Sequence, residues 1–164
     1  MSVNNMDLLE RKRNKIIILI LIISFFILYA GLNVYEYVLK QNTAKFLDCL
    51  INERYEEAFN YINYKDKNNL EVEKGKAAWA SKVKEGKEKG TYIESYGKVR
   101  VSYRDIQAIC NVEITYKEEG KVKTYNSEIS FSTIGGTKIE SIYPISKLSY
   151  IFNHLFIKNS AYQL

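Results

Sequence analysis

The sequence predicts an α+β protein: a membrane-spanning helix followed by a domain of helices packed on an antiparallel sheet. Three observations support this class. A long apolar run lies near the N-terminus, a helical repeat of apolar residues follows it, and after Gly90 the apolar repeat changes to a period of two. Because the strands follow one another rather than alternating with helices, the class is α+β and not α/β.

The apolar run predicts a transmembrane helix over residues 16–36. From Ile16 to Leu32 the only residue outside the apolar and tolerated types is Ser24. About 20 such residues span about 30 Å as a helix, the thickness of a bilayer core. A buried core helix is excluded because the run is apolar on every face. A cleaved signal peptide is the alternative, but the run exceeds the usual length of about 7–15 residues and no small-x-small site follows it. We therefore expect a retained anchor.

Charges and tyrosines around the run predict its orientation. Arg11, Lys12, Arg13 and Lys15 precede it, and Tyr29, Tyr35 and Tyr37 lie toward its far end like an interfacial aromatic belt. The positive-inside rule then predicts a cytoplasmic tail over residues 1–15 and an extracytoplasmic domain after residue 36. Four of the 24 basic residues belong to this topology pattern, so the remaining charge is too small to indicate nucleic-acid binding.

Residues 36–63 predict a helix, either continuous with the span or broken near Asn52. Its apolar positions are Leu47, Leu50, Ile51, Tyr55, Ala58, Phe59 and Ile62. The lysine-rich segment 65–90 predicts a solvated loop, with a short helix around residues 77–83 that carries Trp79.

After Gly90 the period of two predicts a four-strand antiparallel meander with one covered face. Its strands are expected in KVRVSYRD, IQAICNVEITY, VKTYNSEISFSTI and TKIESIYP. KEEGK predicts the hairpin turn between the second and third strands, IGGT predicts the next turn, and Pro144 ends the last strand. The second strand places Ile106, Ala108, Cys110, Val112, Ile114 and Tyr116 on one face.

Residues 147–164 are predicted to contain an amphipathic helix after the domain of residues 37–146. Two interpretations remain: the apolar side packs on the domain, or it contacts a partner or the membrane surface. The residues of this possible partner interface are Tyr150, Ile151, Phe152, Leu155 and Phe156.

The segment FLDCLINERYEEAFNYI resembles the opening helix pair of nuclear transport factor 2-like (cystatin-like) domains, and the strands over 91–117, 121–134 and 137–144 resemble their bent sheet. The likeness covers about residues 43–144 and implies a cone-shaped domain. One departure is that Gly136-Thr137-Lys138-Ile139 lacks the tryptophan common in the last hairpin of such domains.

Two bacterial groups in this superfamily share a short tail, one span and an exported cone domain. One is the bitopic assembly subunit of conjugation and type IV secretion machines, and the other is the N-terminal domain of low-affinity penicillin-binding proteins. The resemblance implies a non-catalytic scaffold in an envelope complex of the cell membrane. Its partners would be the lipid bilayer, other envelope proteins and a possible second copy, with no nucleic acid.

A cone fold also implies a pocket, which is the alternative function: binding of a lipid, a peptide or a cell-wall fragment. The possible pocket residues are Tyr92, Tyr103, Tyr125 and Phe131. Isomerase-like chemistry would need a buried carboxylate beside Tyr, and Asp105 is the candidate, although its place beside Arg104 is typical of an exposed turn. We therefore expect no enzyme.

The remaining reactive side chains predict no cofactor or metal site. His154 and two separated cysteines are too few for a zinc site, and Gly135-Gly136 joins strands rather than forming a phosphate loop. Cys110 is expected in the core and Cys49 off the apolar stripe, so two free thiols are favoured over a disulfide.

Overall fold

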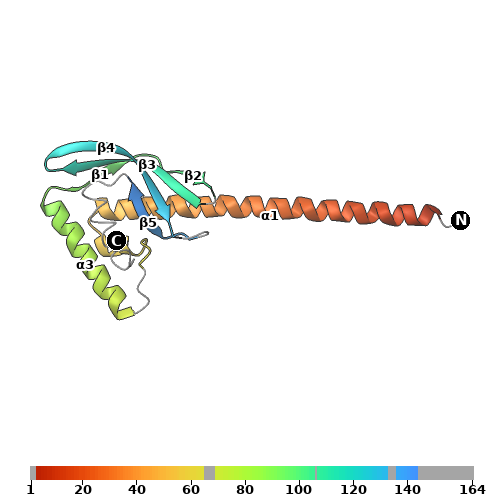
Figure 1. Cartoon of the computed structure of the whole chain (residues 1–164), viewed down its shortest axis with the longest axis horizontal. Helices are drawn as coiled ribbons and strands as arrows, with labels where there is room; N and C mark the ends of the chain where they lie inside the picture. Colours follow the sequence, from red (N-terminus) through yellow and green to blue (C-terminus); the bar gives the residue numbers. More distant parts are fainter. Residues whose placement is uncertain (1–2, 65–68, 106, 133–135, 144–164) are drawn as a thin grey trace, which may run out of the picture. The chain divides into compact units, whose positions relative to one another are not determined.

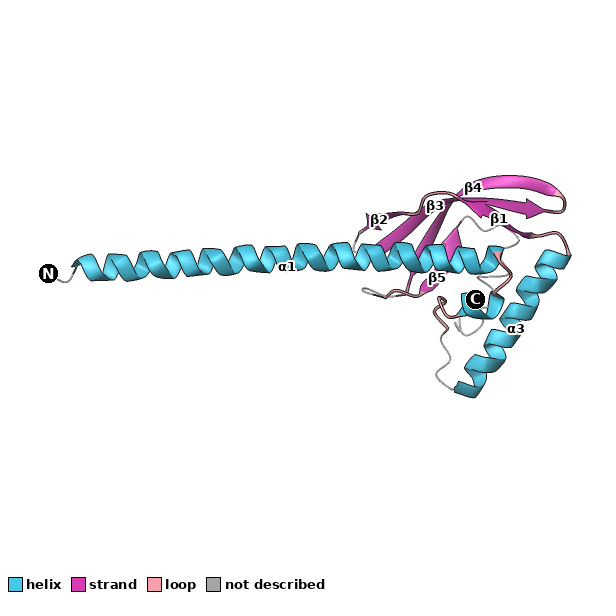
Figure 2. Ribbon diagram, turned by 180° about the vertical axis from the view of Figure 1, so that it is seen from behind, coloured by secondary structure: helices cyan, strands magenta, loops and turns pink. Residues whose placement is uncertain are grey.

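The computed structural model describes residues 3–64, 69–105, 107–132 and 136–143 and confirms the α+β class with an antiparallel sheet (Figures 1 and 2). It divides into two compact units, Met1–Tyr37 and Val38–Leu164. The elements are α1 (Val3–Ile51), α2 (Tyr55–Phe59), α3 (Asn69–Glu88), β1 (Tyr92–Tyr96), β2 (Arg100–Arg104), β3 (Gln107–Glu118), β4 (Lys121–Phe131) and β5 (Ile139–Tyr143).

The first unit consists of the N-terminal part of α1. The helix Lys12–Ile51 contains a stretch that is long and apolar enough to cross a membrane, and none of that stretch is buried in the protein. Phe25 and Leu28, for example, are each 68% exposed. A helix without buried apolar residues over this length is not the core helix of a soluble domain.

In the second unit, the end of α1 supplies one side of the core. Leu39, Thr43, Phe46, Leu47 and Leu50 recur at helical spacing and are all buried. Both features considered for the predicted helix of residues 36–63 are present. Its first part is continuous with the apolar run in α1, and the helix breaks near Asn52 before α2 begins.

The break at the end of α1 is a Schellman motif. Glu53 adopts a left-handed φ of 59°, and the Arg54 amide donates to the Cys49 carbonyl over 2.8 Å. The Glu53 amide donates to the Leu50 carbonyl. This turn redirects the chain, and α2 begins at Tyr55.

The sheet has the order β1-β3-β4-β5, and β2 pairs with another part of β3. The predicted meander corresponds to β2, β3, β4 and β5, and all these pairings are antiparallel. The meander prediction places two strands within residues 91–117, whereas the structure has three, because β1 precedes the two that were predicted. Asp105 has a left-handed φ of 55° between β2 and β3, and Gly97 lies between β1 and β2, where its amide donates to the Glu113 carbonyl.

The alternation predicted for β3 is confirmed from Cys110 onward, whereas Ile109, on the opposite face, is also buried. Ala108, Cys110, Val112, Ile114 and Tyr116 are buried, whereas Ile106 lies outside the described residues. On β4, Ile129 and Phe131 are buried and Tyr125 is half-buried; Thr133, predicted on the same face, lies outside the described residues. The KEEGK turn is also present, with Glu119 and Gly120 at positive φ. We call the face that carries these buried residues the inner face of the sheet.

Helix α3 is longer than the sequence predicts. The lysine-rich segment was expected to be mainly a loop with a helix over 77–83, but α3 covers Asn69–Glu88. Its buried residues Trp79, Val83 and Gly86 are one turn apart, and the Trp79 ring lies 5.9 Å from that of Phe59. This narrow buried stripe packs α3 against the rest of the domain, and the lysines lie on the other sides of the helix.

A buried pair of hydroxyl groups lies on the inner face. Tyr116 and Ser127 are each 1% exposed, and their hydroxyls lie beside each other without a well-aligned hydrogen bond. Burial raises the pKa of Tyr116 to about 12, with the nearby Glu118 carboxylate adding to the shift.

We predict that Tyr116 destabilises the fold at alkaline pH. The folded state holds the neutral phenol, so above pH 10 only the unfolded chain ionises at this position, and the free energy of unfolding falls as pH rises toward 12. The full effect is about 2–3 kcal/mol. Denaturant unfolding of the full chain in detergent, followed by circular dichroism from pH 9 to 12, measures it.

Tyr116→Phe should remove this part of the pH dependence, whereas Tyr143→Phe, at a 54% exposed position, serves as the matched control. An unchanged alkaline slope in the Tyr116→Phe variant would contradict the prediction.

Candidate binding surface on the sheet

The outer face of the sheet, opposite the buried side chains, is polar. Strand register places Asn111 of β3 opposite Glu128 of β4, and Glu113 opposite Asn126. Cross-strand partners share one face. Two carboxylates and two amides therefore alternate along and across the strands, and we call these four residues the amide–carboxylate cluster.

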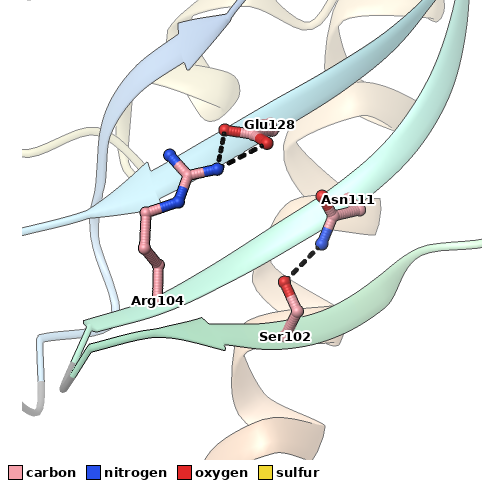
Figure 3. A network of polar contacts seen from close by, with 4 residues as sticks. All are labelled: Ser102, Arg104, Asn111 and Glu128. Atoms are coloured by element: carbon pink, nitrogen blue, oxygen red, sulfur yellow. Dashed lines mark hydrogen bonds and ion pairs between the residues drawn. The ribbon is translucent and has the colours of Figure 1, made fainter.

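Two polar contacts order this face, as Figure 3 shows. Arg104 of β2 reaches across β3 and donates to both carboxylate oxygens of Glu128, over 2.9 and 3.1 Å. The Asn111 side-chain amide donates to the Ser102 hydroxyl over 2.6 Å. Because the amide nitrogen is engaged in this bond, the Asn111 side-chain oxygen remains available as an acceptor.

A hollow of about 460 Å³ lies over this cluster. All four of its residues line the hollow, and the interruption between β1 and β2 contributes Gly97, Lys98 and Arg100. A Cβ atom on Gly97 would lie 3.5 Å from the Glu113 Cβ atom, at ordinary van der Waals contact. No side-chain hydrogen bond or ion pair with another described residue is made by Lys98, Arg100, Glu113 or Asn126.

A second hollow of about 610 Å³ lies between α2 and α3, with Ala77, Ala80 and Ser81 on one side. Its charges are largely paired within the protein. Glu53 accepts from Lys87 over 2.6 Å, and Arg54 donates to Glu57 over 2.7 Å. Fewer polar groups remain for a ligand here than on the outer face.

The four tyrosine and phenylalanine residues predicted to line a pocket lie in different surroundings. Phe131 is 1% exposed in the core, and Tyr103 on β2 is 48% exposed. The Tyr125 ring packs against Tyr116 at 5.8 Å. Tyr92 borders a cavity of only about 10 Å³ and lies under the ammonium groups of Lys87 and Lys117.

The carboxylate–tyrosine pair present in the structure differs from the one considered from sequence. Asp105 is exposed in the β2–β3 turn. Instead, the Tyr96 hydroxyl donates to Asp48 over 2.8 Å, and burial together with this bond raises the pKa of Tyr96 to about 12. Asp48 lies on the part of the helix expected to be polar, so only the fold could reveal the pairing.

Both cysteines are free thiols, and both are buried. The expectation that Cys49 lies off the buried side of the helix is wrong, since it is 1% exposed. The turn after α1 brings Arg54 and Glu57 beside it, which covers a second side of the helix end, and burial raises the pKa of the thiol.

Among the described residues, no group of three or more His, Cys, Asp or Glu side chains is arranged to hold a metal ion. The possible partner interface of Tyr150, Ile151, Phe152, Leu155 and Phe156, and also His154, lies outside the described residues.

The sequence matches no protein-family model, no curated protein and no solved structure.

We predict that the Arg104–Glu128 ion pair orders the outer face but contributes little to stability. Their side chains are 66% and 40% exposed, and exposed pairs typically contribute about 0.2–1 kcal/mol. A double-mutant cycle of Arg104→Ala and Glu128→Ala, measured by denaturant unfolding, should give a coupling free energy in that range. A coupling above about 2 kcal/mol would contradict the prediction, because it would show that the ion pair contributes substantially to the free energy of unfolding.

Proposed function

We propose that this chain is a single-pass membrane protein with a non-catalytic extracytoplasmic domain that serves as a scaffold or assembly factor in a bacterial envelope complex. A conjugative transfer or secretion machine is the first candidate. The function is positional: the apolar part of α1 keeps the domain at the membrane, and the domain surface contacts other envelope proteins.

The observation that carries the proposal is that apolar side chains fill the interior of the domain over the part of the chain that the structure describes. Phe46, Leu47, Ile114, Ile129, Phe131, Ile139 and Ile142 are each at most 1% exposed. An isomerase-like enzyme or an internal ligand site would need a cavity lined by a few polar groups. Filled space on the inner face instead favours a function carried by surfaces.

The apolar helix supports the location. Its lipid-compatible length, the basic residues before it and the tyrosines after it are typical of an anchor whose N-terminal tail is cytoplasmic. Only one residue separates Tyr37, the last residue of the first unit's exposed helix, from the buried Leu39. The segment that would span the membrane and the first buried residue of the domain are therefore adjacent in the sequence.

The likeness to nuclear transport factor 2-like domains agrees with this assignment. Its strongest part is the helix, turn and helix over residues 43–62, which the Schellman turn and α2 match in order. The bitopic assembly subunits of secretion machines have the same layout of tail, span and domain. This resemblance is the reason for naming a transfer or secretion apparatus first.

Purification through an N-terminal tag, from native membranes in mild detergent, tests the proposal. We predict that mass spectrometry will identify a stoichiometric set of membrane proteins with the chain. A tagged control that ends after residue 37 should lose them, because the domain rather than the span is expected to make the contacts. Recovery of the full chain alone, as a monomer or a self-associated form, would contradict an assembly role.

A further inference from the structure

We propose that the hollow on the outer face of the sheet is a saccharide-binding site. This inference rests on the proposed function in one respect, the extracytoplasmic location in which the domain would encounter a saccharide. The amide–carboxylate cluster of Asn111, Glu113, Asn126 and Glu128 forms the floor of the hollow, and Lys98 and Arg100 border it at the β2 edge.

The hydrogen-bonding groups of the cluster match those of a sugar. Each sugar hydroxyl is both a donor and an acceptor, so neighbouring hydroxyls need donors and acceptors side by side. A carboxylate only accepts, whereas an amide offers both functions. The register Asn111–Glu128 and Glu113–Asn126 alternates these two groups in both directions of the sheet. A flat array of this kind suits a ring whose hydroxyls point outward in its own plane.

Hydrogen bonds within the protein fix two side chains of the cluster, and acceptors and donors remain for a ligand. Glu128 is fixed by Arg104 and Asn111 by Ser102, as Figure 3 shows, so little side-chain entropy is lost when a ligand binds. Glu113 and Asn126 lie directly opposite each other, and their side chains make no hydrogen bond or ion pair with another described residue. The hollow of about 460 Å³ falls within the usual range of small-molecule sites, about 300–1,000 Å³.

An exposed aromatic ring lies beside the cluster. Tyr143 on β5 is the cross-strand partner of Glu128 and is 54% exposed on the same face. The apolar C–H side of a sugar ring packs on an aromatic ring while its hydroxyls reach polar neighbours. A row of cross-strand partners therefore runs over four adjacent strands, from the cation of Arg100 through Asn111 and Glu128 to the aromatic ring of Tyr143.

A divalent cation fits this hollow poorly. Lys98 and Arg100 add two positive charges at its border, and Glu128 already binds Arg104. The same two cations favour a saccharide that carries a carboxylate, because neither has an ion-pair partner among the described residues.

Saturation-transfer difference NMR on the full chain tests the proposal. The detergent must have a phosphocholine headgroup, since glucoside and maltoside detergents would compete as sugars. The probes are N-acetylchitotetraose, which is neutral, and a hyaluronan tetrasaccharide, which carries carboxylates. We expect saturation transfer to both, with dissociation constants on the order of 1 mM or below and tighter binding of the acidic probe.

Asn126→Ala should weaken binding of both probes about five- to tenfold, because the partner hydroxyl loses its hydrogen bonds. Lys98→Ala should weaken only the acidic probe. Ser141→Ala, which alters a hydroxyl on the same face but outside the hollow, is the matched control. Circular dichroism verifies that each variant is folded.

The proposal is overturned if neither probe shows saturation transfer at about 10 mM, or if binding persists unchanged in a double variant of Glu113→Ala and Asn126→Ala. This result is independent of the co-purification experiment. Saccharide binding without co-purified proteins would refute the assembly function alone, and the opposite pair of results would refute the saccharide site alone.

Discussion

The fold of the domain depends on the burial of one side of a single helix. From Leu39 to Leu50, α1 presents a stripe of apolar residues at helical spacing, and the inner-face residues of β3, β4 and β5 are buried in the same core. Burying side chains of this size contributes about 1.5–3 kcal/mol each. Nearer the N-terminus the same helix is apolar all round and unburied, so one element combines a lipid-compatible stretch with the core of a folded domain.

This arrangement places the polar side chains of β3 and β4 on the outer face of the sheet. Among the described residues, large apolar side chains cover the inner face, and the polar residues at alternate positions face outward. Register then decides which of these residues meet. A shift of one residue between β3 and β4 would exchange the inner and outer side chains, so the buried Ile114 and Ile129 also fix the position of the amide–carboxylate cluster.

Much of the fold could be predicted because the patterns were local. The apolar run, the break near Asn52, the alternation in β3 and the turn at Gly120 each depend on residues close in sequence. The length of helix α3 was underestimated because only Trp79, Val83 and Gly86 of this lysine-rich segment are buried. The contact of Trp79 with Phe59 of α2 depends on the tertiary fold. The burial of Cys49 was missed for another reason: the prediction treated the helix as straight at this point, whereas the turn after α1 places Arg54 and Glu57 beside the thiol.

The candidate site was less predictable than the fold. The tyrosines singled out from sequence were chosen for lying on strands, but their surroundings depend on where the covering elements end. The outer-face cluster has a signal that could have been found, since Asn111-Val112-Glu113 and Asn126-Ser127-Glu128 repeat the same polar pattern on two strands joined by a hairpin. Counting residues back from the Glu119-Gly120 turn would have paired them, because hairpin register follows from the turn.

The most direct test of the account is the topology of the chain in intact cells. In a Cys49→Ala, Cys110→Ala background, Ser2→Cys and Lys98→Cys are each treated with a membrane-impermeant maleimide. We expect labelling of Lys98→Cys in intact cells and labelling of Ser2→Cys only after permeabilisation. Protection of Lys98→Cys, or a mature chain that has lost its N-terminal residues, would contradict a retained anchor with an extracytoplasmic domain.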